Sequence, residues 1–535
     1  MGSRGKARWL IGAAAACGAL MTAAAPAAAF DVALEAKNFA KILERQVHVT
    51  LQPDFQARLI EQEVAGPLQL AELLAKDPER NPLSLCATRQ GECAGDVRFY
   101  EWEESGAGKV SEAHWTARSG ATISGRVWAT RSGPRKRPAV VITTGSVQAP
   151  ETLYWPLAAT LAKHGYVVLT YDVQGQGRSD TFGEAPDANE NFPFQQASNF
   201  VDGTEDALDF LLSKPAAPYE PRRSCTTGTS HAPKQERRVD AGLNAAHNPF
   251  WRLVDRKRVA IAGHSLGARA VSYVGQKSRR VDAIAAFDNL ATPTKPSECA
   301  SAPGSRADAA ITKPALGISN DYGIVQTPFL ADPNPEEKLT AFKAYREARV
   351  DAMQMTIRGG SHEESAFIPG RVAPVPLGSA TLRGQDLIAW YTTAWFDKYV
   401  KCPGLRRARR CGARADRRLS TDRWLHDEPG RSVDLNDDAN LFSFYFRSRF
   451  NLAAARGGRL RCADMRTGCA SMRPDGAPLP YSLVRDAHRP DGTAVRMPAA
   501  ARCTALTGPA APTGCAAAPE VSAEEQLRRS RRLAD

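Results

Sequence analysis

A serine between two glycines lies in the sequence Gly-His-Ser-Leu-Gly at positions 263–267. Glycines at both ends of a Gly-x-Ser-x-Gly pattern allow a sharp turn from a strand into a helix, and the serine then lies on the turn with its hydroxyl exposed. An apolar run at 258–262 leads into the pattern, and a helical segment with small residues, 268–274, follows it. We therefore predict that Ser265 is a nucleophile.

A serine hydroxyl is a weak nucleophile near neutral pH and needs an adjacent base. Among the nine histidines, His362 follows the last apolar run, residues 352–357, and the loop that carries it contains Gly359 and Gly360. His264 lies beside the nucleophile, where we expect its side chain to point away and to serve in packing. The order nucleophile, acid, histidine also agrees with this chemistry. We predict that His362 is the base.

The base needs a carboxylate that holds the imidazole in one tautomer and stabilises it when charged. Asp321 follows the apolar run that starts at residue 314, and Asp288 follows the run at 281–287. The acid usually follows the penultimate strand of such a sheet, which favours Asp321. Asp288 is the alternative acid, and its other interpretation is a helix cap or a residue that lines the cleft.

Attack on a carbonyl creates an oxyanion, which two backbone N–H groups can stabilise. We expect one N–H from Leu266, directly after the nucleophile, and the other from Ser146, in the loop after the first parallel strand. A missing donor would cost roughly 3 kcal/mol of transition-state stabilisation.

These residues require a scaffold of alternating strands and helices. Apolar runs that can be buried on both sheet faces occur at 139–143, 166–171, 258–262, 281–287, 314–318 and 352–357, with helical patterns at 153–164, 201–212, 268–277 and 386–400. This alternation predicts an α/β fold with a doubly wound, mostly parallel sheet. Alternating segments at 97–102, 114–117 and 123–129 predict antiparallel strands before it. We assign residues 96–401 to this domain and 213–250 to a surface insertion.

Both ends of the chain differ from this domain. Residues 1–29 combine basic residues, an apolar run and an Ala-x-Ala site, which is typical of a secretory signal peptide rather than a membrane anchor. Lipid attachment at Cys17 is disfavoured because the usual leucine three positions earlier is missing. Residues 30–95 have the periodicity of helices, and residues 402–535 suggest an Arg-rich appendage held by disulfides. We therefore expect a secreted protein with no stable membrane insertion.

Cysteine usage also indicates export, because ten cysteines remain after Cys17. Most of these cysteines lie close to another one in the sequence and are paired with it, and the remaining two form a long-range pair. The predicted disulfides are Cys86–Cys93, Cys225–Cys299, Cys402–Cys411, Cys462–Cys469 and Cys503–Cys515. We find no CxxC pair and no histidine at ligand spacing, so we expect no metal site.

The positive charge of the chain is concentrated near its end. From Cys402 onward there are 24 arginines and no lysine against 15 acidic residues, which accounts for +9 of the formal net charge of +12. Aromatic stacking positions are not interleaved with these residues, so we expect a solvated surface and no nucleic-acid partner. No nucleotide or flavin motif is present, and we expect no cofactor.

Residues 138–400 resemble the secreted α/β hydrolases related to bacterial lipases, cutinase-like polyester hydrolases and dienelactone hydrolases. The matching pieces are Gly145-Ser146, 161–172, 263–267, Asn320-Asp321 and 359–362. The resemblance implies an α/β-hydrolase fold with Ser265 as nucleophile, Asp321 as acid, His362 as base, and Ser146 and Leu266 as oxyanion donors. Polyester hydrolases usually have an aromatic residue at the position of Ser146 and often a methionine at that of Leu266. Dienelactone hydrolases use a cysteine nucleophile, so we do not expect that activity.

The leading functional hypothesis is a secreted hydrolase that cleaves small or lipid-like carboxylic esters through an acyl-enzyme intermediate. A peptidase or an acyl transferase would use the same residues, because one fold and one catalytic machinery serve many substrates. A catalytically silent binding protein is the hypothesis from another class, although such a protein would not need all three catalytic side chains.

Overall fold

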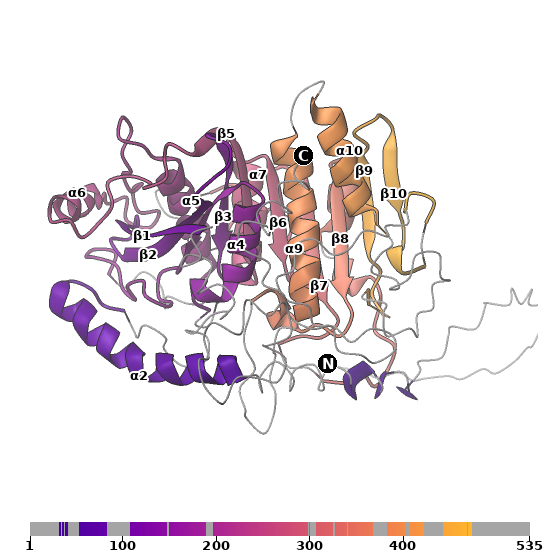
Figure 1. The fold of residues 1–535 in the computed structure, drawn as a ribbon, viewed down its shortest axis with the longest axis horizontal. Helices are drawn as coiled ribbons and strands as arrows, with labels where there is room; N and C mark the ends of the chain where they lie inside the picture. The colour runs from indigo at the N-terminus through magenta and orange to yellow at the C-terminus, as the bar shows by residue number, and fades with distance from the viewer. Residues whose placement is uncertain are drawn as a thin grey trace, which may run out of the picture.

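The computed structural model has alternating strands and helices along most of the chain (Figure 1). It describes residues 32–33, 35–36, 38–40, 53–82, 108–146, 149–188, 196–297, 299, 306–324, 327–339, 341–366, 382–402, 407–421, 442–443, 445–467 and 469–472. The predicted signal peptide, the predicted strand at 97–102 and the last 63 residues lie outside the described residues.

Six parallel strands form the centre of the sheet, in the spatial order β4-β3-β5-β6-β7-β8. They are β3 (Arg137–Thr143), β4 (Val167–Tyr171), β5 (Val254–His264), β6 (Ala283–Phe287), β7 (Ala315–Asn320) and β8 (Ala352–Ile357). The predicted α/β class with a mostly parallel sheet is confirmed. The chain moves from β3 outward to β4 and then returns to the other side of β3 with β5. Such a reversal opens a crevice at the carboxyl ends of the two middle strands.

Both faces of the parallel strands are covered, which explains their continuous apolar runs. In β3, Val140 and Ile142 belong to one buried cluster, and Ala139 and Val141 belong to the other, because successive side chains point to opposite faces. The first cluster includes residues of α4 (Trp155–Lys163) and α9 (Leu382–Phe396), and the second includes residues of α5 (Ala197–Leu212), α7 (Leu266–Lys277) and α8 (Phe342–Glu347).

Antiparallel strands extend the sheet at both ends. On one side β1 (Gly108–Thr116) pairs with β2 (Thr122–Thr130), which pairs with β4. The structure corrects the expected appendage at the other side, because β9 (Arg449–Ala453) pairs with β8, and β10 (Arg459–Cys462) pairs with β9. Phe450 and Leu452 alternate with more exposed neighbours and join the core cluster of α9. This segment belongs to the main sheet because β9 pairs with the edge that β8 would otherwise expose.

Two further helices pack near opposite ends of this sheet (Figure 1). Helix α10 (Arg407–Leu419) follows α9 and contributes Leu419 to the same core cluster. The predicted insertion contains α6 (Ala232–Asp240), and it packs on the sheet rather than standing away from it. The Tyr219 hydroxyl donates to the Thr116 carbonyl at the end of β1, and the Gln235 side chain accepts from the Thr116 N–H.

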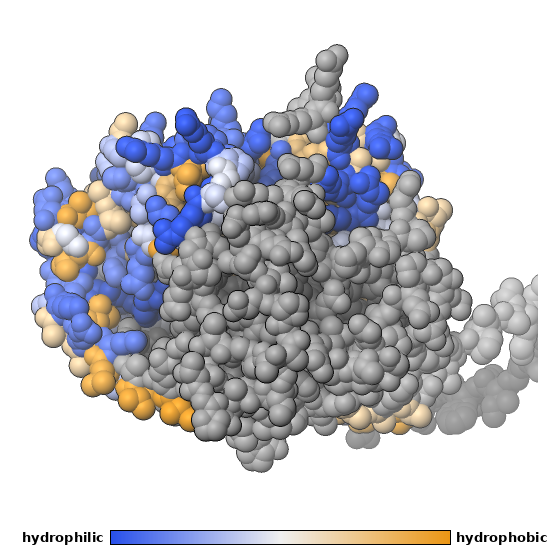
Figure 2. Space-filling model, viewed as in Figure 1, coloured by the Kyte–Doolittle hydropathy of each residue, from blue (hydrophilic) through white to orange (hydrophobic). Residues whose placement is uncertain are grey.

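The helical residues of the N-terminal extension that the structure describes lie along the lower edge of the molecule as drawn in Figure 1. Its long helix is α2 (Pro53–Lys76), in agreement with the predicted helical character of this region. Figure 2 shows apolar side chains along this helix, where Ile60, Val64 and Leu68 are exposed. Within the residues that the structure describes, no helix combines the length and apolar character needed to cross a membrane.

Three of the five predicted disulfides are present: Cys225–Cys299, Cys402–Cys411 and Cys462–Cys469. The pairs Cys86–Cys93 and Cys503–Cys515 lie outside the described residues. The first of the three closes 74 residues of sequence and ties the insertion to the segment after β6. The other two each lie within the C-terminal part of the chain.

Candidate active site

Ser265 lies on the turn between β5 and α7, as the Gly-x-Ser-x-Gly pattern predicts. Its backbone has φ 57° and ψ −121°, a region that a serine rarely adopts, and its N–H donates to the carbonyl of Phe287 on β6 at 2.9 Å. A Cβ on Gly263 would lie 2.3 Å from the Gly267 carbonyl oxygen. The turn therefore needs its glycines, and it leaves the serine partly exposed at the N-terminus of α7.

His362 lies after β8, and its nearest acid is Asp288, not Asp321. The distance from His362 Nδ1 to Asp288 Oδ2 is 2.6 Å. Burial disfavours the charged imidazole, but the hydrogen bond and negative charge of Asp288, together with Glu363, outweigh it and raise the pKa of His362. Asp288 follows β6, the strand next to β5, and has a positive φ of 43°. The alternative acid of the sequence analysis is thus the residue that contacts the histidine.

Asp321 binds the backbone of the loop that carries His362. It follows β7 and is almost fully buried, and its Oδ2 accepts a hydrogen bond from the N–H of Gly359 at 2.7 Å. Burial raises its pKa to about 6, although hydrogen bonds from Ser443 and Gly359 oppose the shift. The order of strands along the chain favoured Asp321, but its carboxylate accepts a hydrogen bond from the backbone of Gly359, three residues before His362.

The predicted oxyanion donors lie on either side of the elbow. Leu266 is the first residue of α7, and N–H groups in the first turn of a helix have no partner within the helix. Ser146 follows Gly145, where an added Cβ would come 3.3 Å from the Ser265 Cβ. The loop after β3 therefore approaches the nucleophile closely. Gln176 holds this loop, donating to the Gly145 carbonyl at 2.8 Å and accepting from the Ala149 N–H at 3.0 Å.

His264 does more than pack, which was its expected role. It is almost fully buried, and the ring of His362 lies 4.7 Å away, centroid to centroid. Its Nδ1 lies 2.8 Å from the Tyr154 hydroxyl, and its Nε2 lies 2.8 Å from the backbone carbonyl of His362. The Tyr154 hydroxyl also accepts from the N–H of Gly145 at 2.8 Å. No sequence pattern indicated these hydrogen bonds, because the residues that form them come from three distant parts of the chain.

Glu35 of the N-terminal extension reaches the same edge of the sheet. Its buried carboxylate accepts hydrogen bonds from the hydroxyls of Tyr322 and Tyr445 and from the N–H of Phe329. Tyr322 directly follows Asp321, and its N–H donates to the Gly360 carbonyl at 3.0 Å. The extension is therefore connected to the loop that carries the predicted base.

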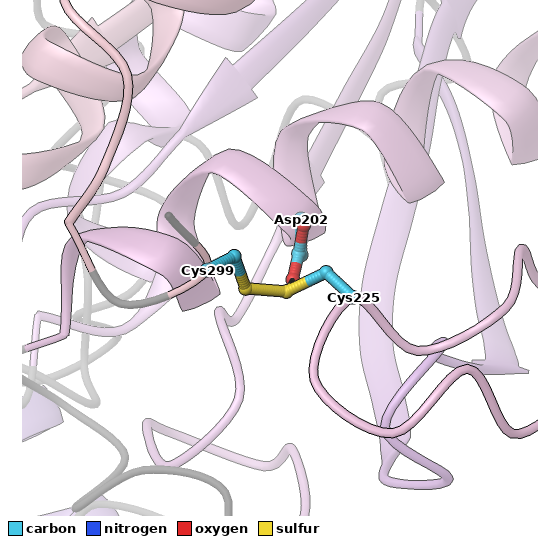
Figure 3. Close-up of side chains that lie close together, drawn as sticks. All are labelled: Asp202, Cys225 and Cys299. Atoms are coloured by element: carbon cyan, nitrogen blue, oxygen red, sulfur yellow. Dashed lines mark hydrogen bonds between the residues drawn. A yellow bond between two sulfur atoms is a disulfide. The ribbon is translucent and has the colours of Figure 1, made fainter. Parts of the chain in front are cut away.

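Among the described residues, one group of possible metal ligands lies close together: Asp202, Cys225 and Cys299 (Figure 3). The two cysteines form a disulfide, so neither provides a thiolate. Asp202 pairs with the guanidinium groups of Arg118 and Arg306. This group is explained by a disulfide beside an ion pair.

A comparison of the sequence with known protein families and with curated proteins found no match.

Proposed function

We propose that this protein is a serine hydrolase that cleaves carboxylic esters with Ser265 as nucleophile, His362 as base and Asp288 as acid. One observation carries the proposal: a serine with φ 57° on a strand-to-helix turn lies at the sheet edge where a histidine and a carboxylate are 2.6 Å apart. The proposal replaces Asp321 with Asp288 because of that contact.

The Ser265 Oγ would attack the carbonyl carbon of the ester while its proton passes to His362 Nε2. Asp288 holds the Nδ1 proton and stabilises the imidazolium that results, which the raised pKa of His362 supports. The N–H groups of Leu266 and Ser146 would stabilise the oxyanion. Collapse of the tetrahedral intermediate releases the alcohol, which takes the proton from His362, and leaves an acyl-enzyme.

Water then attacks the acyl-enzyme, giving its proton to His362, and the second collapse releases the acid and returns the proton to Ser265. The buried carboxylate of Asp321 would have no contact with the reacting atoms. Its contribution is to hold the backbone at Gly359, and so the position of the base.

Hydrolysis of chromogenic esters of increasing acyl length, beside aminopeptidase substrates, tests this proposal. We expect ester hydrolysis to fall by roughly 10⁶-fold in kcat in Ser265→Ala, as in other serine hydrolases that lose the nucleophile. Ser278→Ala, at the other end of α7, is the matched control and should keep full activity. Activity toward amide substrates only, or ester activity that survives Ser265→Ala, would contradict the proposal.

We also propose that the protein is exported, which the three disulfides of the structure support. N-terminal sequencing of protein recovered outside the producing cell should then start at Phe30, and a chain that retains residues 1–29 would argue against a cleaved signal.

A further inference from the structure

The hydrogen bonds around His264 have a defined direction. The carbonyl of His362 can only accept, so His264 Nε2 must carry a proton. Burial, with the positive charge of His362, lowers the pKa of His264 well below its usual value, so the ring is neutral and Nδ1 is an acceptor. The Tyr154 hydroxyl therefore donates to Nδ1 and accepts from Gly145.

These three hydrogen bonds join the two loops that the proposed reaction uses. One end is the N–H of Gly145, the residue before the proposed oxyanion donor Ser146. The other end is the carbonyl of the proposed base His362. His264, the residue before the proposed nucleophile, lies between these two ends; we call the three hydrogen bonds together the connection. Tyr154 and His264 are almost fully buried, so water competes little for the bonds that their side chains make with each other and with Gly145.

We propose that Tyr154 and His264 are positioning residues that hold the oxyanion loop and the loop of the base in register with Ser265. The inference rests on the proposed function. Neither side chain needs to contact the reacting atoms, and no proton has to move along the connection. Each acts by fixing a backbone group, and a misplacement on the scale of 1 Å is enough to cost a hundredfold in rate.

The neighbourhood of Gly145 supports this interpretation. A Cβ at this position would lie 2.9 Å from His264 Nδ1 and 3.2 Å from the Tyr154 hydroxyl, in addition to its approach to Ser265. The backbone, the phenol and the imidazole are thus in close contact behind the nucleophile. Tyr154 lies at the start of α4, so the connection also anchors these loops to a helix of the core.

Four substitutions separate the two ends of the connection. Tyr154→Phe removes the bonds to Gly145 and to Nδ1. In His264→Gln the side-chain amide nitrogen can take the place of Nε2 and keep the bond to His362. In His264→Asn an amide atom can take the place of Nδ1, and the bond to His362 is lost. His264→Leu loses both.

Steady-state kinetics with a chromogenic ester, after titration of active sites with a fluorophosphonate, measure the effect per competent site. We expect kcat to fall at least tenfold in Tyr154→Phe and His264→Leu, with KM within twofold of wild type. His264→Gln should be more active than His264→Asn if the bond to His362 matters. The acid limb of the pH profile should move to lower pH in His264→Asn, because the His362–Asp288 pair is less well aligned, and should stay in place in Tyr154→Phe.

Tyr166→Phe is the matched control, because Tyr166 is also buried and donates to Asp397 at 2.9 Å, away from these loops. Thermal melting of each variant shows whether it is folded, and the His264 variants keep the test informative if Tyr154→Phe does not fold. Wild-type kcat per titrated site in all four variants would overturn this inference alone. A folded wild-type protein that the fluorophosphonate does not label would overturn the proposed function, and this inference with it.

Discussion

Changing Asp288 and Asp321 in the same way gives opposite expectations for catalysis. Asp288→Asn removes the charge that faces His362 and leaves an amide that can present its NH₂ to Nδ1, which stabilises the wrong tautomer. Asp321→Asn keeps an oxygen that can accept the bond from Gly359. The two variants therefore make the same chemical change in two carboxylates that follow neighbouring strands, β6 for Asp288 and β7 for Asp321.

The expected size of the effect follows from the contact itself. Two unit charges 2.6 Å apart interact by about 6 kcal/mol at an effective dielectric constant near 20. The loss of a triad acid with the geometry kept lowers kcat by about 10⁴-fold, which corresponds to about 5.5 kcal/mol. The two estimates agree, so we expect a loss of kcat near 10⁴-fold in Asp288→Asn and less than tenfold in Asp321→Asn.

The pH profile provides a second measure of the same contact. The imidazole of His362 must be neutral to accept a proton, so activity rises as the pH passes its pKa. Asp288 raises that pKa, and the acid limb of kcat/KM in Asp288→Asn should therefore lie at lower pH than in wild type. Ester hydrolysis from pH 5 to 9 measures both quantities. A large loss in Asp321→Asn with little loss in Asp288→Asn would refute the assignment of Asp288 and return the acid to Asp321.

Three further predictions concern stability, each measured as the free energy of unfolding in urea. Burial raises the pKa of Asp321 to about 6. Between roughly pH 4 and 6 this carboxyl is therefore ionised in the unfolded chain but protonated in the folded one, and the free energy of unfolding of the wild type falls by up to about 3 kcal/mol as the pH rises. Asp321→Asn lacks this loss and should gain stability relative to wild type from pH 4 to 7; an unchanged difference would contradict the burial argument. Replacing both Cys225 and Cys299 by serine should cost up to about 4 kcal/mol, because the disulfide closes a 74-residue loop and so lowers the entropy of the unfolded chain; equal stability would contradict this loop-closure argument. Leu452→Ala should cost about 3 kcal/mol, whereas Leu330→Ala, at a side chain that is 91% exposed, should be neutral; a neutral Leu452→Ala would argue against a core role for β9.

The sequence predicted the central strands because their apolar runs are long enough to be buried on both faces. It also predicted the elbow at Ser265, since strand, glycines and helix are all local features. Of the three disulfides within the described residues, Cys402–Cys411 and Cys462–Cys469 were predicted from their close spacing, and Cys225–Cys299 was predicted as the pair left over.

The acid could not be chosen from the sequence, because Asp288 and Asp321 both follow parallel strands between the nucleophile and the base. Their neighbours decide the matter: the strand of Asp288 adjoins β5, while Asp321 is engaged by the Gly359 N–H. Strand β9 was missed because it is five residues long and flanked by arginines, with only Phe450 and Leu452 to mark its buried face.

The role of His264 depends on contacts with Tyr154 and His362, and no local pattern encodes them. The contact between Glu35 and two tyrosine hydroxyls is of the same kind, because it joins residues 287 and 410 positions apart. Local sequence patterns do not encode such side-chain contacts between distant segments.

Mass spectrometry after reaction with a fluorophosphonate shows whether Ser265 is an activated nucleophile. We expect one phosphonyl adduct, on the peptide that contains Ser265, with none in Ser265→Ala and much slower labelling in His362→Ala. No adduct on the folded protein, or an adduct that persists in Ser265→Ala, would contradict this expectation.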